Sequence, residues 1–566
     1  MSTLFVILIS TFVLSNNSQI PYLKFHYFES QMKVLIIGAG ASGLPSLKTA
    51  LEYGLDAVCM EKSSDIGGLW RYKENPGPGE GTVMKSTVIN SSKEMSAYSD
   101  FPPPREAANY MHNREMLNYL RSYAAHFDLL KHIQFQTEVI NVQRVEDFEE
   151  SGKWTVTYRR TDDTEQKVIT DTFDGVMFCS GHHYAERWPN PPFPGQSLFR
   201  GQFIHSRAYH TAKPFEDQTV VVVGIGNSGG DIAVELSKVT KKVYLSTRTG
   251  TWVINRVWEK GHPTDAVLLN RFAFALRAIT PRSVQNSLIE RKLNFRFDHE
   301  RYGLRPSHRF LEAHVTVNDE LPNRIASGTV VVKPNIQKFG EKDVVFEDGS
   351  KVYGVDTVIF ATGYSFFFPQ LENGRLISVQ DNKTLLYKLM FPHDLSPKNT
   401  LAIIGLIQPT GSIMPISEMQ ARLFCAQLVG DIALPEKSKM VADALAQAKK
   451  ISKEFVNRPR HTIQVQYVDY MDELAELVGC KPKLFRRIFT DPCLAKLLIF
   501  NGLVPYQFRL DGPHQWEGAR KAILEMDERM FENTMTRKTW KEGGKTKKRI
   551  TKKMGGGLVR SISGYI

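Results

Sequence analysis

The sequence predicts an α/β protein built from two units of the same plan, with the second unit inserted into the first and a helical C-terminal region after both. Residues 34–37 form an apolar run that leads into a glycine-rich turn and an amphipathic helix, and residues 220–223 open the same pattern again. Residues 174–181 and 356–363 resemble each other, and each indicates a short buried strand ending in glycine. One precedes the second unit and the other follows it, which is the order that an insertion produces.

The chain has 566 residues, too many for one simple domain. A proline-rich break at residues 188–195 marks a crossing between units, and residues 265–318 indicate a helical insertion in the second unit. The expected segments are an atypical apolar leader at 1–32, the first unit at 33–188 and 331–435, the second unit at 189–330, a helical region at 436–537, and a basic, disordered tail at 538–566.

Composition narrows the class of protein. Five cysteines are scattered without a C-x-x-C pair, which argues against a disulfide framework, a zinc site or a disulfide reductase and fits a reducing compartment. No residue is assigned to a metal. The net charge of +12 suits phosphate-bearing cofactors or an anionic membrane surface. The alternative is that this charge serves only to keep the protein soluble. No run of 18 or more apolar residues predicts a membrane span.

The first glycine turn, GAGASG, follows an apolar strand and opens a helix. Gly38 permits the tight turn, Gly40 lets the backbone approach a pyrophosphate, and Gly43 lets the helix pack on the strand. The next strand ends at Glu61, whose carboxylate suits ribose hydroxyls and repels a 2′-phosphate, so this unit is expected to hold FAD or NAD. The alternative for Glu61 is a solvated charge. Residues 67–70, GGLW, indicate either a ring-binding turn or a turn with a core tryptophan.

The second glycine turn, GIGNSG at residues 224–229, repeats this geometry and implies a second dinucleotide. The strand that follows ends in Ser246, Thr247 and Arg248 rather than in an acid. Hydroxyl groups and a guanidinium suit a 2′-phosphate, so this unit is expected to prefer NADPH. An acid-ended unit and an arginine-ended unit in one chain together suggest hydride transfer from NADPH to a flavin.

Residues 199–209 read FRGQFIHSRAY, and their residue types alone indicate only that His205 is a structural histidine. The pattern F-x-G-x-x-x-H-x-x-x-Y resembles the signature of flavin-containing monooxygenases. The likeness includes both glycine turns and GGLW, and it spans nearly everything from residue 33 to about 537. It extends to KSTVINSSKEM at 85–95, STR at 246–248, ATGY at 361–364 and GLIQP at 405–409. Tyr209 and His210 stand where related Baeyer–Villiger enzymes usually carry Trp-Pro.

The resemblance implies FAD and NADPH as cofactors and assigns residues to both. FAD is expected at Gly38, Ala39, Gly40, Ala41, Ser42, Gly43, Glu61, Gly68, Leu69 and Trp70. NADPH is expected at Gly224, Gly226, Asn227, Ser228, Gly229, Gly230, Asp231, Ser246, Thr247 and Arg248. The resemblance places Asn90 and Ser91 at the flavin–nicotinamide junction, and Gln408 and Thr410 beside the flavin cleft. Asn90 is assigned as the catalytic residue that holds this junction by side-chain hydrogen bonds; without the surrounding motif it reads as an ordinary turn asparagine.

The resemblance also implies the reaction: oxygenation of a soft nitrogen or sulfur nucleophile, or oxygen insertion beside a ketone, through a flavin C4a-hydroperoxide. The first alternative is an uncoupled NADPH oxidase that releases hydrogen peroxide, and the second is a catalytically idle flavoprotein that acts as a binding partner. The expected partners are a small amine, sulfide or ketone, O2 and a membrane surface, without nucleic acid; a homo-oligomer stays open. The family implies the endoplasmic reticulum membrane with the catalytic part facing the cytosol, although the C-terminus here is basic and glycine-rich rather than an anchor helix.

Overall fold

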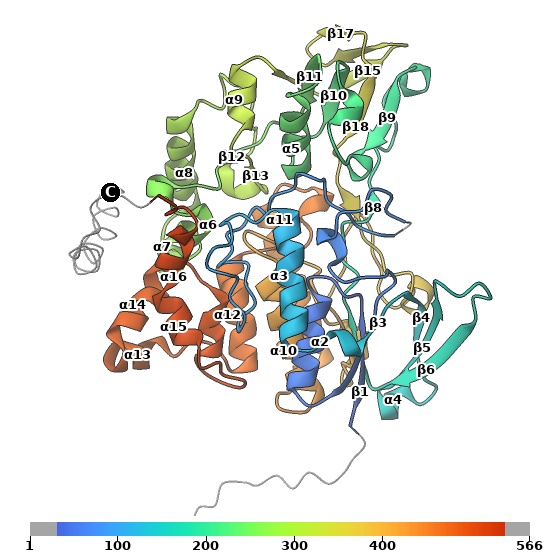
Figure 1. Cartoon of the computed structure of the whole chain (residues 1–566), viewed down its shortest axis with the longest axis vertical. Helices are drawn as coiled ribbons and strands as arrows, with labels where there is room; N and C mark the ends of the chain where they lie inside the picture. The colour runs from blue at the N-terminus through green and yellow to red at the C-terminus, as the bar shows by residue number, and fades with distance from the viewer. Residues whose placement is uncertain (1–30, 78, 538–566) are drawn as a thin grey trace, which may run out of the picture.

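The computed structural model describes residues 31–77 and 79–537. Figure 1 shows two sheets stacked along the long axis of the molecule, with the C-terminal helices, in red, beside the lower part. The expected basic tail, and all but the last two residues of the expected leader, lie outside the described residues.

The first sheet contains five parallel strands in the order β20-β7-β1-β2-β3. Their bounds are β1 Lys33–Ile37, β2 Asp56–Met60, β3 Ile133–Gln134, β7 Gly175–Phe178 and β20 Leu401–Ile403. Val34 and Ile36 of β1 belong to the core shared with helices α2 and α10, whereas Leu35 and Ile37 face the core shared with sheet β4-β5-β6. Both faces are therefore covered, which explains why the strand is apolar throughout instead of alternating.

The elements that cover the first sheet come from distant parts of the chain. On the side of α2, helix α10 packs directly against it. The antiparallel sheet β4-β5-β6 covers the other side. The bounds are α2 Gly43–Glu52, α3 Asn113–His126, α10 Met414–Leu428, β4 Thr137–Arg144, α4 Phe148–Ser151, β5 Trp154–Arg160 and β6 Val168–Phe173.

The second sheet repeats the plan with five parallel strands in the order β14-β11-β10-β18-β9. Helices α5 and α9 cover one face, and the small antiparallel sheet β15-β16-β17 covers the other. The bounds are β9 Gln202–His205, β10 Thr219–Val223, α5 Asn227–Leu236, β11 Lys242–Ser246, α9 Leu321–Ala326, β14 Val330–Lys333, β15 Ile336–Phe339, β16 Asp343–Phe346, β17 Lys351–Tyr353 and β18 Thr357–Phe360.

The chain leaves the first sheet after β7 and returns to it at β20, so the predicted insertion is confirmed. The predicted boundary at residues 330 and 331 is wrong, because β14 and β18 both pair within the second sheet. The similarity between residues 174–181 and 356–363 has a different origin from the one expected. β7 lies beside β1 and β18 lies beside β10, so the two segments are equivalent strands of the two units.

Helices from the insertion and from the C-terminal region complete the molecule (Figure 1). Helix α12 packs on α10 and α14 packs on α7, and the short parallel pair β21–β22 ties the C-terminal region to the first unit. Strand β8 (Ala185–Glu186) pairs with β19 (Tyr364–Ser365) where the chain crosses between units. The remaining bounds are β12 Val253–Ile254, α6 Thr264–Leu268, α7 Arg271–Ile279, α8 Arg282–Arg296, β13 Thr316–Val317, β21 Gln408–Pro409, α11 Lys437–Glu454, β22 Gln464–Val465, α12 Tyr467–Val478, α13 Leu484–Thr490, α14 Pro492–Phe500, α15 Ala519–Leu524 and α16 Met526–Glu532.

A buried group of charges joins the C-terminal region to the first unit. The Arg509 side chain is 1% exposed, and its guanidinium lies 2.9 Å from Glu52, 3.1 Å from Asp100 and 3.0 Å from Glu418. Burial alone would raise the pKa of Glu52, but the positive charges of Arg509 and Lys48 lower it to about 2. The Glu52 carboxylate therefore stays ionised, and this depends on the nearby positive charges.

Replacing Arg509 with Met should leave these buried carboxylates without their shared cation. Breaking a buried ion pair from one side costs about 3–5 kcal/mol, and a loss of this size is expected in the free energy of unfolding from a denaturant titration. The control is Arg520→Met, which removes an ion pair with Asp491 at the surface. That change should leave the free energy of unfolding nearly unchanged. Equal losses of unfolding free energy in the two variants would contradict a structural role for Arg509.

Candidate functional site

Each glycine turn brings a helix into direct contact with the turn itself. Gly38 and Gly224 have φ values of +98° and +106°, which favour glycine. A Cβ atom on Gly43 would lie 1.7 Å from the carbonyl oxygen of Gly38, and one on Gly229 would lie 2.0 Å from that of Gly224. Side chains are thus excluded at both positions, and helices α2 and α5 begin at the carboxyl edges of their sheets.

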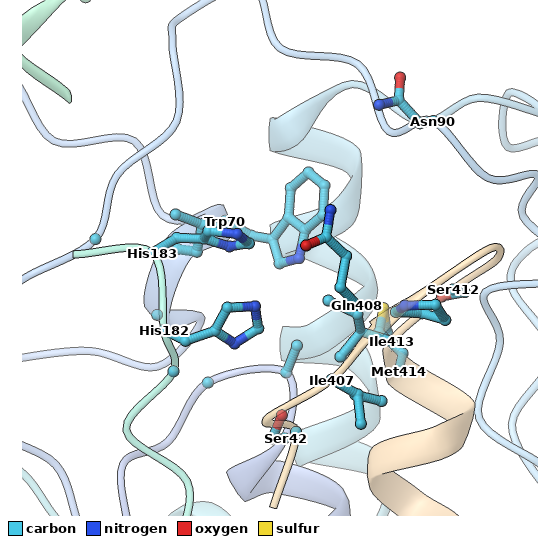
Figure 2. A pocket seen from close by; sticks show the side chains of 18 of the residues that line it. Ser42, Trp70, Asn90, His182, His183, Ile407, Gln408, Ser412, Ile413 and Met414 are labelled. Atoms are coloured by element: carbon cyan, nitrogen blue, oxygen red, sulfur yellow. The ribbon is translucent and has the colours of Figure 1, made fainter. Parts of the chain in front are cut away.

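A cavity of about 860 Å³ opens over the first glycine turn. Its wall continues through the segment after β7 and the loop before α10, and Figure 2 shows the side chains of Trp70, His182 and Gln408 around the hollow. The predicted residues that line it are Gly38, Gly40, Ala41, Ser42, Glu61, Gly68, Leu69, Trp70, Asn90, Ser91, Asn227, Gln408 and Thr410.

A second cavity of about 680 Å³ opens over the second glycine turn. It runs from the segment after β18 to the end of β11, and residues 458–460 of the C-terminal region close one side. The predicted residues in its wall are Leu69, Trp70, Asn90, Gly224, Gly226, Asn227, Ser228, Gly229, Asp231, Ser246, Thr247, Arg248 and Gln408.

The two cavities share one wall. The residues that line both are Leu69, Trp70, Ile89, Asn90, His182, His183, Asn227, His314, Val315 and Gln408. Asn90 lies here, and its Oδ1 accepts a hydrogen bond of 2.7 Å from Nη2 of Arg256, which is also paired with Asp319 at 2.8 Å. The Asn90 oxygen is thus held by the protein, so its Nδ2 hydrogens are the polar groups it offers to the cavities.

The strand ends that were predicted to select the nucleotides differ in charge as expected. Glu61 at the end of β2 accepts hydrogen bonds from the backbone N–H groups of Ala39, at 2.7 Å, and Ser63, at 2.9 Å. At the end of β11, Arg248 is exposed and faces a cavity that also contains Arg458 and Arg460. One edge is therefore acidic and the other is basic.

Three predicted cofactor residues lie behind the cavity walls rather than in them. Ala39 is fully buried. A Cβ atom on Gly43 would overlap the carbonyl oxygen of Gly38, so this glycine packs against the turn. A Cβ on Gly230 would lie 3.3 Å from the Thr316 side chain, which places this glycine against β13. These residues therefore do not line either cavity, and they permit close packing beneath the turns.

Two pairs of site residues were missed by the sequence analysis. His182 and His183 directly follow the glycine at the end of β7, and residues that follow strand ends gather at the carboxyl edge, so this signal was available. Burial lowers the pKa of His183 to about 4 and the pKa of His182 well below its ordinary value, which keeps both neutral near pH 7. Arg458 and Arg460 carry no local signal, because only the tertiary fold brings them to β11.

The linker histidine has the structural role that its residue type indicated. His205 is 1% exposed, its Nδ1 accepts from the backbone N–H of Arg207 at 3.1 Å, and its Nε2 lies 3.1 Å from the carbonyl oxygen of Gly363. It holds the ends of β9 and β18 together beneath the second cavity.

Sequence comparison decides the family. The family described as flavin-binding monooxygenase-like matches residues 31–556. The chain belongs to the flavin-binding monooxygenases. Flavin-containing monooxygenase 5 of Cavia porcellus is 49% identical over 512 residues, which cover 90% of this chain and 95% of that protein. Dimethylaniline monooxygenase [N-oxide-forming] 2 of Mus musculus is 46% identical over 505 residues, covering 89% and 93%.

Solved structures share the fold of this monooxygenase. S-allyl-L-cysteine S-oxygenase from Allium sativum aligns with a TM-score of 0.60 at 23% identity, covering 89% of this chain and 99% of that one. Cyclohexanone monooxygenase from Rhodococcus sp. Phi1, solved bound to NADP+, aligns with a TM-score of 0.55 at 18% identity, covering 79% and 98%. At these identities the likeness concerns the fold.

Asp231 of this monooxygenase gives a pH-dependent prediction. Burial raises its pKa from 3.8 to about 6, against the opposing effects of Arg256 and a 2.8 Å hydrogen bond from Asn318. Because the folded state holds this proton more tightly than the unfolded chain, the stabilising contribution is present below pH 4 and is lost as pH rises through 6. Asp231→Asn should therefore be more stable than the parent at pH 8, by at most about 3 kcal/mol. Denaturant titrations should show that gain shrinking as pH falls towards 4, and a pH-independent difference would contradict the burial of this charge.

Proposed function

We propose that this monooxygenase binds FAD in the first cavity and NADPH in the second, and oxygenates a soft nitrogen or sulfur centre. The local geometry fits both cofactors. A Cβ on Gly68 would lie 3.1 Å from Cα of Gly40, so two stretches of bare backbone meet where the pyrophosphate of FAD would lie. At Gly226 a Cβ would have no neighbour within 4 Å, so that turn faces open space.

The helix N-termini supply donors for both pyrophosphates. Neither α2 nor α5 has a side-chain cap, so N–H groups at the start of each helix stay available to an anion. Glu61 would accept the ribose hydroxyls of FAD, and Arg248 would hold the 2′-phosphate of NADPH. These roles follow from where the side chains lie at the two strand ends.

The shared wall supports a reaction between the two cofactors. Bound FAD would accept a hydride from NADPH and deliver one atom of O2 to the substrate. The chain would position this chemistry with Asn90, Gln408 and the neutral His182. The loop and first residue of α10, at residues 412–414, line the first cavity, and the positive end of this helix favours negative charge there.

The apolar part of the first cavity's wall suits an uncharged or soft substrate. Its wall includes the apolar side chains of Ile254, Leu268, Leu269, Phe310, Leu311 and Phe455. Such a lining excludes water and accepts an amine in its neutral form, a sulfide or a ketone. No pair of general acid and base is needed for this role, because the cofactor supplies the oxidising power.

The shared wall carries this proposal, and the coupling of NADPH oxidation to product formation tests it. Purified holoenzyme should convert a tertiary amine, a thioether or a ketone with nearly one product per NADPH consumed. The alternative, an NADPH oxidase, predicts one hydrogen peroxide per NADPH with or without these substrates. Oxygenated product and peroxide are both measured in each reaction, and peroxide as the sole product would overturn the proposal.

Asn90→Ala should loosen the shared wall without removing either nucleotide site. We expect NADPH oxidation to continue while product per NADPH falls roughly tenfold and peroxide rises, since small misplacements are costly to coupled reactions. Asn335→Ala is the matched control, because Asn335 lines only the second cavity, where its amide pairs with Glu347. An unchanged ratio of product to NADPH in Asn90→Ala would show that this residue has no role in the active site.

Two alanine variants of the second turn separate nucleotide binding from folding. Gly226→Ala should keep the parent's unfolding midpoint, since its φ is −72° and the new methyl group meets no protein atom, while the affinity for NADP⁺ falls at least roughly tenfold. Gly229→Ala should lower the midpoint, because overpacking costs about 1–3 kcal/mol or more. Fluorescence titration and thermal unfolding measure the two effects, and a normal affinity in Gly226→Ala would contradict the assignment of this turn.

We further propose attachment to a membrane surface, which the family resemblance would place at the endoplasmic reticulum. Apolar side chains project from α7, α8 and α13, including Ile279, Phe295, Phe485 and Phe489. Phe295 is 90% exposed, and α7 and α13 both contact α14. None of the helices within residues 31–77 and 79–537 combines the length and apolar character needed to span a bilayer.

A further inference from the structure

Three arginines from two distant parts of the chain meet at the end of β11. Arg248 follows this strand directly, while Arg458 and Arg460 come from the segment between α11 and β22, and all three line the second cavity. Nη2 of Arg458 donates a 2.8 Å hydrogen bond to Oγ1 of Thr249, the residue next to Arg248. The two segments are therefore in contact.

The C-terminal segment is held firmly in this position. Pro459–His461 forms a single 3-10 turn, and β22 then pairs with β21 at the edge of the first cavity. His461 is 1% exposed, and its Nδ1 bonds to the carbonyl oxygen of Val456 at 2.8 Å. Nε of Arg460 donates to Nε2 of His461 at 3.1 Å, which uses the inner edge of the guanidinium. The two terminal nitrogens of Arg460 are left for another partner.

The charge of this cluster is not balanced by the part of the chain that the structure describes. None of the three arginines has a described carboxylate within ion-pair distance, whereas the buried Arg509 and Arg529 are both paired. Among residues 31–77 and 79–537, Asp231 is the one acidic residue that lines the second cavity, and its Oδ1 accepts a hydrogen bond from Asn318. Burial and the repulsion of the neighbouring arginines lower the pKa of Arg460 to about 10. Positive charges held together in this way would be stabilised by an anion.

We infer that Arg458 and Arg460 form the second wall of the 2′-phosphate site, opposite Arg248. The inference rests on the proposed function, because the nucleotide and its direction in the cavity come from the glycine turn and the end of β11. A phosphate dianion matches several guanidinium groups, which can each donate two hydrogen bonds to it. Selection of NADPH over NADH is then shared between the second unit and the C-terminal region, and the nucleotide bridges them.

The test measures ligand binding rather than turnover. Oxidised holoenzyme is titrated by calorimetry with 2′,5′-ADP, which carries the 2′-phosphate, and with 5′-AMP, which lacks it. The variants are Arg458→Gln, Arg460→Gln, the double variant, and Arg248→Gln as the positive control. Arg301→Gln is the matched negative control, since that side chain is 86% exposed and lies outside the cavity. Flavin content and the unfolding midpoint are recorded for every variant.

Each single C-terminal variant should bind 2′,5′-ADP roughly ten- to hundredfold more weakly, with little change for 5′-AMP, since one charged hydrogen-bond contact is worth that much. Arg458→Lys and Arg460→Lys should recover part of the loss, because lysine restores the positive charge but not the paired hydrogen-bond donors of the guanidinium group. This partial recovery separates recognition of the phosphate from a loss of folding, as does a normal flavin content.

Three outcomes overturn the inference in different ways. If Arg248→Gln weakens 2′,5′-ADP binding while both C-terminal variants bind it like the parent, the C-terminal segment has no part in recognition and the proposed NADPH site stands. If the parent itself binds 2′,5′-ADP no more tightly than 5′-AMP, the NADPH assignment fails together with the inference. If the C-terminal variants lose affinity equally for 2′,5′-ADP and 5′-AMP, the arginines support the structure of the cavity and do not recognise the 2′-phosphate.

Discussion

The absence of a side chain at Gly43 and Gly229 is the constraint on which the site depends. Each glycine lets the first turn of a helix lie directly on the carbonyl oxygen of the preceding glycine turn, closer than any Cβ atom permits. The helix N-terminus thereby reaches the carboxyl edge of its sheet, where open parallel sheets bind their ligands. Because the same contact occurs in both units, the molecule carries two helix N-termini without side-chain caps that open into adjacent cavities, and such helix ends favour anions.

The proposed function places the reaction where these two cavities share a wall. The first unit contributes the GGLW turn, the Asn90 loop, the segment after β7 and the loop before α10 to that wall, and the second unit contributes Asn227, His314 and Val315, so no single unit contains it. The C-terminal region completes the arrangement from outside both sheets: Arg509 fixes it to the first unit, and Arg458 contacts the second. A region that lacks any recognised motif therefore sets how the two nucleotide units face each other.

Much of the fold was predictable because its signals are local. The strand–glycine–helix units, the acid at Glu61 and the arginine at Arg248 are each encoded within about thirty residues. The end of the second unit was misplaced because a buried strand looks the same whichever sheet it joins: β18 follows the local pattern of β7, and only pairing with β10 assigns it. Arg458 and the ion group around Arg509 could not be found for the same reason, since the partners of these two arginines lie 91 to 457 residues away in sequence.

The central claim is that NADPH in the second cavity reaches FAD in the first across the shared wall. Anaerobic mixing of oxidised holoenzyme with NADPH, followed by the loss of the oxidised flavin absorbance, measures this directly. The account predicts full and rapid bleaching by NADPH and much slower bleaching by NADH at the same concentration. Flavin that is reduced by dithionite but not by NADPH would contradict it, because the two cavities would then not bring their ligands together.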